Sequence, residues 1–210
     1  MKLIVFTISV FLLSAFSVQA QDFYGSTDLK TFRDGRDKEF RNKEESPLLD
    51  EDFSNFKGLN YFDVDKKFRV KAVFERTPDE KYFQMPTSSG KLRKFVKYGI
   101  LKFKLNGQTF LLNAYQYDEE TLKEIPGDND LLFVPFRDLT SGKETYAGGR
   151  YMDVRIGKNK KINLDFNLAY NPSCAYGSER FSCPIPPKEN FLQTEIKAGE
   201  KIFDYFGKKH

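Results

Sequence analysis

Beyond residue 59, apolar and polar positions alternate along much of the chain, which is the pattern of β-strands with one buried face. The first such segment spans residues 68–74, where every second side chain is apolar. The predicted inward-facing residues are Phe68, Val70, Ala72 and Phe74. This period of two predicts that strands dominate the rest of the chain.

The clearest single element is a β-hairpin over residues 98–117. The Asn-Gly dipeptide at residues 106–107 favours a two-residue type I′ turn, and such a turn pairs Leu105 with Gln108. In this register the apolar residues of both strands share one face, and the intervening lysines point the other way. The shared apolar face comprises Leu101, Phe103, Leu105, Phe110, Leu112 and Ala114. Because the turn and the pattern agree, the sequence defines this register.

Less regular segments surround these strands. Residues 28–45 carry widely spaced apolar side chains among charged ones and predict an amphipathic helix, with Asp28 as its N-cap. Two polar stretches, residues 77–90 and 118–130, are interpreted as a loop and a connection. Residues 131–136 are predicted to form a short buried strand. One leading helix and many short strands predict a mainly β fold: a single antiparallel β-sandwich or partly open barrel with one N-terminal α-helix.

The first 20 residues have the order of a secretory signal peptide. Lys2 supplies a short positive region, Leu3–Phe16 an apolar run, and Val18–Ala20 small residues at the positions that a signal peptidase recognises. A membrane anchor is the alternative, but the apolar run is shorter than the roughly 20 residues of a transmembrane helix. We therefore expect cleavage after Ala20 and export to the periplasm or the cell exterior, with no transmembrane segment.

The rest of the chain is expected to hold one folded domain. Residues 21–45 would form a leader and the helix, and residues 46–207 the β domain. The chain has no tryptophan but 22 phenylalanines and 11 tyrosines, so aromatic rings are expected to fill much of the core. The formal net charge is +4, and the lysine groups at residues 91–97 and 158–161 are small. Because nucleic-acid binding needs a concentrated basic surface, no nucleic-acid partner is expected.

Cysteine and histidine are too scarce for most catalytic and metal sites. The two cysteines, Cys174 and Cys183, lie close in sequence, which in an exported protein favours a disulfide over a zinc site or a nucleophile. The one histidine is His210, the last residue. Catalytic triads and metal sites that need histidine are therefore nearly excluded, and no cofactor or metal is expected. Acid–base chemistry would fall to carboxylates, tyrosine or lysine.

Polar and chemically versatile residues concentrate in Glu144–Lys201. Alternating apolar residues predict a hairpin of Arg150–Ile156 and Ile162–Leu168, joined by residues 157–161. The polar residues predicted to face each other are Tyr151 and Asn167, Asp153 and Asp165, and Arg155 and Asn163. Facing carboxylates are unfavourable unless they are solvated, neutralised or bridged by a cation, so a calcium site is a minor alternative. An ordinary solvent-exposed sheet face is the other interpretation.

A restrained loop follows this hairpin. It begins at Asn171, returns through the proline-rich segment Cys183–Pro187, and brings Glu189 and Asn190 back towards the sheet. A rigid loop over a polar sheet face can enclose a preorganised pocket. Alternatively, the prolines and the disulfide seal one end of the fold, and the asparagines satisfy backbone groups.

Several strings of this chain resemble a known family. They are DLTSGKETYAGGRY from Asp138, LDFNLAYNPSCAY from Leu164, CPIPPKEN from Cys183, AGEK from Ala198 and, upstream, FKGLNYFDVDKKFRVKA from Phe56. Over residues 46–201 the sequence resembles the bacterial domain-of-unknown-function family 1684. Since that family has no assigned activity, the resemblance implies a set of residues and no reaction. The ligand-binding candidates by matching position are Arg150, Tyr151, Asp165, Asn167, Tyr170, Asn171, Glu189 and Asn190, beside the cysteines Cys174 and Cys183.

Two classes of function are compatible with these residues. The first is a non-catalytic binding or structural β domain of the cell envelope, with a polar pocket for a small polar ligand such as a saccharide, on which Tyr151, Tyr170 and Tyr176 would stack. The second is a carboxylate-dependent hydrolase with Asp165 and Glu189 as acid and base. The first is favoured because the sequence shows no recognisable nucleophile or metal set. The sequence leaves open whether the protein is an enzyme and which oligomeric state it adopts.

Overall fold

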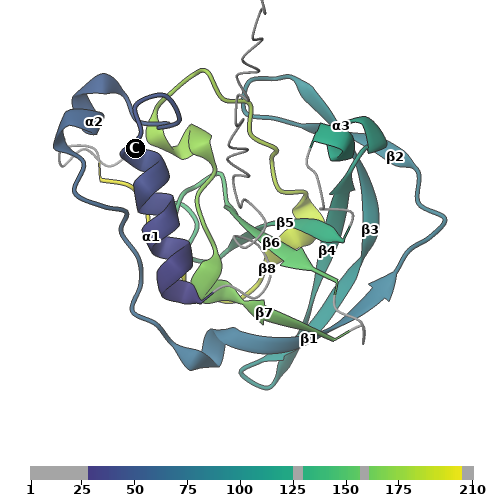
Figure 1. Ribbon diagram of the computed structural model, residues 1–210. Coiled ribbons are helices and arrows are strands. Elements are labelled where there is room, and N and C mark those ends of the chain that lie inside the picture. Colours follow the sequence, from purple (N-terminus) through teal and green to yellow (C-terminus); the bar gives the residue numbers. More distant parts are fainter. Residues whose placement is uncertain (1–27, 125–129, 157–160, 205–210) are drawn as a thin grey trace, which may run out of the picture.

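The computed structural model describes residues 28–124, 130–156 and 161–204 of the chain (Figure 1). Within them, eight strands form one sheet that curls into a nearly closed barrel, and helix α1 (Leu29–Phe40) packs beside it. The expected mainly β fold with one N-terminal helix is therefore confirmed, in its partly open barrel form. The predicted signal peptide lies outside the described residues, among which no helix has the length and apolar character needed to cross a membrane.

The sheet is antiparallel apart from one short strand. The strands are β1 (Arg69–Arg76), β2 (Tyr82–Pro86), β3 (Leu92–Leu105), β4 (Gln108–Tyr117), β5 (Leu131–Asp138), β6 (Arg150–Arg155), β7 (Lys161–Asp165) and β8 (Phe191–Leu192). Their hydrogen-bonded order is β6-β5-β4-β3-β1-β7, with β2 beside β3 and β8 parallel to β5. Strands β6 and β7 are the two ends of this order and contact each other, so the curl of the sheet nearly closes the barrel.

The hairpin of β3 and β4 has the register that the sequence predicted. Leu105 pairs with Gln108, and the turn residues Asn106 and Gly107 have φ of +50° and +79°, as a type I′ turn requires. The predicted inward residues of 68–74 are all buried, as are those of β3 and β4 except Phe110, which is half-buried. These side chains form the interior of the barrel together with residues of β5, β6 and β7.

A second apolar cluster covers the other side of part of the sheet. It contains Met85, Phe95, Tyr115, Phe133 and Tyr151, which come from β2 to β6. Because β5 lies between this cluster and the barrel interior, all of its first six residues are buried. Burial on both faces explains why apolar and polar residues do not alternate in this strand, and it confirms the predicted buried strand.

Two polar stretches hold more structure than predicted. The expected loop at residues 77–90 contains β2, an edge strand that pairs with β3 and ends at Pro86, where a missing N–H costs little. The expected connection at residues 118–130 contains helix α3 (Glu119–Glu124). The Asp118 carboxylate accepts hydrogen bonds from the first backbone N–H groups of that helix.

Helix α1 begins as predicted but ends early. The Asp28 carboxylate accepts a hydrogen bond from the Thr31 N–H at 3.2 Å, which confirms the N-cap. The helix ends at Phe40 because residues 41–46 offer no further apolar side chain to the core. The remaining short helices are α2 (Asp50–Asn55), η2 (Lys66–Phe68), η3 (Phe166–Leu168), η4 (Ser173–Tyr176) and η5 (Lys188–Asn190).

Candidate functional site

The predicted polar face on a β6–β7 hairpin is wrong. Strand β6 pairs with β5 and β7 pairs with β1, so Asp153 lies opposite Phe133 and Asp165 lies opposite Arg69. Asp153 and Asp165 are therefore not paired across strands, as the predicted calcium site required. The pairs Tyr151–Asn167 and Arg155–Asn163 are wrong for the same reason. The apolar pattern specified which side chains point inward, but not which strand lies beside which.

Arg150 lies at the start of β6 and is fully buried. Its Nη2 donates to the Asp138 carboxylate at 3.0 Å and to the Ile196 carbonyl at 2.8 Å, and its Nη1 donates to the Ala198 carbonyl. Burial lowers the pKa of Arg150, and the Asp138 carboxylate opposes that effect. Since Asp138 is also buried, this pair is a clasp that holds the C-terminal segment against β5 and β6.

A close backbone contact explains the AGEK string beside this clasp. Gly199 has a φ of +77°, and a Cβ at this position would lie 2.5 Å from the Ala169 carbonyl oxygen. The same carbonyl accepts a hydrogen bond from the Glu200 N–H at 2.8 Å. Glycine is the residue that combines this left-handed conformation with such a close approach, so the string meets a backbone requirement.

Glu200 is the centre of a second buried clasp, which sequence reasoning did not single out. Its carboxylate accepts hydrogen bonds from the Asn171 N–H at 3.0 Å, from Asn171 Nδ2 at 3.1 Å and from the Tyr176 hydroxyl. Arg36 of α1 lies 3.7 Å from the carboxylate and donates to the Asn171 carbonyl at 3.4 Å. Burial raises the pKa of Glu200, although Arg36 and the hydrogen bonds from Tyr176 and Asn171 lower it.

The Asn190 side chain supplies hydrogen bonds between β4 and β5 that backbone groups of paired strands would otherwise make. Its Oδ1 accepts from the Asn113 N–H at 2.8 Å, and its Nδ2 donates to the Asn113 carbonyl at 2.9 Å and the Pro135 carbonyl at 2.7 Å. In the described residues β4 and β5 pair at one position, Tyr115 with Phe133, so this fully buried amide joins two strands that share few bonds of their own. The neighbouring Glu189 is exposed.

Tyr151 and Tyr170 bond to the protein and do not form a stacking platform. Each donates its backbone N–H to the carbonyl of the other, at 2.8 and 3.0 Å, and their rings meet edge to face with centroids 5.9 Å apart. The Tyr151 hydroxyl donates to the Pro184 carbonyl and the Tyr170 hydroxyl to the Asp153 carboxylate. Burial raises the pKa of Tyr151, so its hydroxyl stays protonated.

Asp165 and Asn167 close the turn after β7. Asp165 accepts from Arg69 Nε and from Asn167 Nδ2, both at 2.7 Å. Asn167 is fully buried and bonds both backbone groups of Asp65 at 3.1 Å. Both carboxylate oxygens of Asp165 are thus bound by neighbouring side chains, whereas Glu189 is exposed to solvent.

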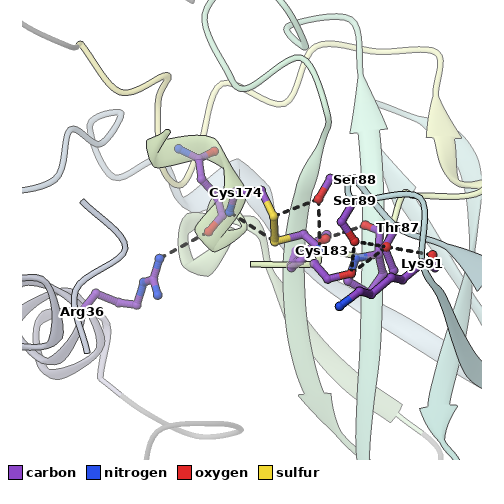
Figure 2. The surroundings of a disulfide bond; sticks show 11 residues. Arg36, Thr87, Ser88, Ser89, Lys91, Cys174 and Cys183 are labelled. Atoms are coloured by element: carbon purple, nitrogen blue, oxygen red, sulfur yellow. Dashed lines mark hydrogen bonds between the residues drawn. A yellow bond between two sulfur atoms is a disulfide. The ribbon is translucent and has the colours of Figure 1, made fainter. Parts of the chain in front are cut away.

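The expected disulfide between Cys174 and Cys183 is present (Figure 2). It links η4 to the proline-rich segment, and the Ser88 hydroxyl lies 3.0 Å from Cys174 Sγ while it accepts from the Cys183 N–H at 3.1 Å. The Ser88 N–H donates to the Cys183 carbonyl at 2.9 Å. Figure 2 shows that the stapled loop is thereby fastened to the Thr87–Lys91 turn between β2 and β3.

Most of the sequence-predicted site residues therefore form structural clasps. The buried ones bond to backbone groups or to carboxylates, and Glu189 is exposed. Within the described ranges there is no group of three or more histidine, cysteine, aspartate or glutamate residues that could hold a metal ion. These candidates therefore occupy several separate clasps: at the C-terminal segment, at the turn after β7, and between β4 and β5.

A pocket lies elsewhere on the surface, beside α2. It has a volume of about 360 Å³, which lies within the size range of small-ligand sites. Its described lining residues are Asp52, Asn55, Phe56, Lys57, Gly58, Asn60, Phe203 and Asp204. The pocket therefore combines two aromatic rings with carboxylate, amide and ammonium groups.

The walls of this pocket are fixed to the core. The Phe56 ring packs against Phe40 with centroids 5.6 Å apart, and the Phe203 ring packs against Tyr176 with centroids 5.3 Å apart. The Lys201 N–H donates to the Asn60 carbonyl at 2.8 Å, which joins the two walls. Exposed polar residues on such a loop carry no periodic signal, so the sequence did not identify this pocket.

Comparisons with known proteins agree with the fold and give no activity. Residues 54–201 match the sequence model of a family described as protein of unknown function (DUF1684). The chain is similar to an uncharacterized protein of Haloarcula marismortui, solved by solution NMR, at 38% identity over 82% of this chain and 91% of that one, with a TM-score of 0.64. No curated protein matches the chain. The buried clasps of Arg150, Asn171 and Asn190 lie within the matched residues.

Proposed function

The chain belongs to the DUF1684 family of proteins of unknown function, and we propose that it is an exported, non-catalytic binding domain for a small polar ligand such as a saccharide. The ligand site of this proposal is the pocket beside α2, in place of the residues that the sequence suggested. The observation that carries the proposal is the composition of that pocket, whose half-buried rings stand among exposed amide and charged groups.

This set of side chains suits a sugar. The C–H faces of a pyranose pack on aromatic rings, which Phe56 and Phe203 supply from two separate segments of the chain. Sugar hydroxyls both donate and accept hydrogen bonds, and the amides of Asn55 and Asn60 can meet both needs. Because the rings are anchored in the core, the pocket is largely preformed, which lowers the entropic cost of binding.

Export is the second part of the proposal. The signal-peptide pattern of the first 20 residues and cleavage after Ala20 would place the mature domain in the periplasm or outside the cell. The Cys174–Cys183 disulfide supports this because such bonds persist in oxidising compartments. Mass determination of the protein purified from its own cells tests it, since the expected mature chain begins at Gln21 and an uncleaved chain would contradict it.

Binding is tested with the mature chain by screening a panel of mono- and oligosaccharides with calorimetry. We expect affinity between micromolar and millimolar without turnover, and loss of binding in Asn60→Ala and Phe203→Ser. Asn163→Ala, an exposed asparagine on β7, is the matched control and should bind normally. If no saccharide binds, or if the pocket variants bind as well as the control, the proposed site is wrong.

A further inference from the structure

The outward face of four neighbouring strands carries an unusual concentration of lysine. Along β7, β1, β3 and β4, alternate residues point away from the barrel interior. The exposed lysines on this side are Lys71, Lys102, Lys104 and Lys161, here termed the lysine face. The formal charge of +4 for the whole chain conceals this local excess.

The strand registers place these lysines side by side. Val73 of β1 lies opposite Lys161 on one neighbour and Lys102 on the other, and Lys102 lies opposite Leu111 of β4. This gives one row of Lys161, Val73, Lys102 and Leu111 across the sheet. Lys104, two positions along β3, begins a second row opposite Thr109. The lysines thus form a patch and are not scattered over the surface.

The charge of this patch is not neutralised within the described part of the chain. None of its four lysines belongs to an ion pair there, and Lys71 donates to the amide oxygen of Asn163. Two carboxylates share the face. Asp165 is paired with Arg69 at 2.7 Å, and Glu75 lies towards the far end of β1. The centre of the lysine face therefore attracts anions.

Two apolar side chains stand in the middle of these charges. Val73 and Leu111 are 48% and 53% exposed, although alternation in both strands would allow polar residues there. Exposed apolar residues ringed by lysine are the composition of surfaces that meet the headgroup region of an anionic bilayer. Phosphates of nucleic acid would satisfy the lysines but offer these two side chains no apolar environment.

We propose that the lysine face docks on an anionic lipid bilayer. Lys71, Lys102, Lys104 and Lys161 would contact lipid phosphates, and Val73 and Leu111 would enter the interface between headgroups and acyl chains. This role is independent of the ligand pocket, whose described lining residues come from α2, the loop that follows it and the C-terminal segment, and include none of the four lysines.

The test is co-sedimentation of the mature full-length chain with vesicles. We expect binding to phosphatidylcholine vesicles that contain phosphatidylglycerol, little binding to phosphatidylcholine alone, and release by salt. In the variant K71Q/K102Q/K104Q/K161Q the partition coefficient should fall about fivefold for each lysine removed. The control K30Q/K43Q/K91Q/K188Q makes the same charge change at exposed lysines elsewhere and should retain most of the binding.

Three results would overturn the proposal. One is equal loss of binding in the two quadruple variants, which would mean that net charge alone acts. Another is unchanged binding in a variant with Val73→Thr and Leu111→Gln, which would show that these two apolar side chains do not contribute to binding. The third is tighter binding of a DNA duplex than of anionic vesicles at equal salt, which would assign the face to nucleic acid. Unfolding midpoints of all variants verify that each chain is folded.

Discussion

The C-terminal segment of residues 144–201 and the pocket segment of residues 52–60 use similar residue types for opposite purposes. In the first, Arg150, Asn171 and Asn190 are fully buried, and their side chains bond to backbone groups or to a buried carboxylate. In the second, asparagine and lysine side chains are exposed around a cavity. The comparison shows that polar residues concentrated in one stretch of sequence indicate a binding surface only where their side chains are exposed. Where the side chains are buried, they stabilise the fold.

The physical reason lies in backbone hydrogen bonding. After β7 the described chain contains three short 3₁₀ helices and a two-residue strand, so much of its backbone has no ladder or helix partner. Buried N–H and C=O groups must still be bonded, and arginine and asparagine supply several donors and acceptors from one side chain. In the pocket segment, by contrast, the side chains of Asn55, Lys57 and Asn60 are exposed to solvent.

The strongest test of this comparison removes the Arg150 guanidinium. Arg150→Met leaves the buried Asp138 carboxylate without its cation and three backbone carbonyls without this donor, so we expect a loss of about 3–5 kcal/mol in the free energy of unfolding. Urea unfolding followed by circular dichroism measures it. The double variant D138N/R150M should recover part of the loss, because it removes the buried charge while an amide oxygen can still accept from the Thr140 and Ile196 N–H groups. A single-variant loss below about 1 kcal/mol would show that the clasp does not hold the segment.

Breaking the disulfide should have the next largest effect. The Cys174→Ser, Cys183→Ser chain frees a loop with a sequence separation of 9, for which the chain-entropy model gives about 2–3 kcal/mol. Thermal unfolding with and without a reductant measures the change, and the reductant should not affect the variant. If wild-type stability is insensitive to reduction, the loop is held by the Ser88 hydrogen bonds alone.

Local signals predicted the hairpin, whereas contacts between distant segments escaped sequence reasoning. Asn106 and Gly107 determine a register within a few residues, because turn geometry acts on the two strands it joins. The partner of β6 depends on how the whole sheet curls, and the apolar pattern of residues 150–168 is satisfied equally by a hairpin or by two separated strands. The resemblance identified most of the important polar positions but could not distinguish clasps from ligand contacts.

Glu200 and the pocket escaped for different reasons. Glu200 is an acidic residue near the C-terminus, and its burial depends on Arg36 and Tyr176, which lie far from it in the sequence. Pocket residues such as Asn60 follow no period because solvent tolerates any polar side chain there. Buried polar groups and exposed concave groups are both products of tertiary structure, which a single sequence encodes only indirectly.

The buried clasp around Glu200 should also respond to pH. Burial raises the folded-state pKa of Glu200 above its ordinary value of 4.5, so the folded protein holds this proton more tightly than the unfolded chain. This contribution to stability is complete below that ordinary pKa and is lost as pH rises through the folded-state pKa, with a slope of at most about 1.4 kcal/mol per pH unit. Glu200→Gln has no proton to lose at this position. The free energy of unfolding of the wild type minus that of the variant should therefore decrease as pH rises. A difference that stays constant with pH would contradict the raised pKa of Glu200.

The smallest effect on stability is expected at the pocket, where the same substitution can be compared between the two regions. Asn190→Ala leaves the backbone groups of Asn113 and Pro135 unbonded in the interior, and each unsatisfied group costs about 1–3 kcal/mol. Asn60→Ala removes an exposed amide and should change the free energy of unfolding by no more than about 0.5 kcal/mol. Parallel urea titrations of the two variants give both values. A large loss in Asn60→Ala would mean that the pocket wall also depends on this side chain for its structure, and the distinction between a clasp and a binding surface would then fail.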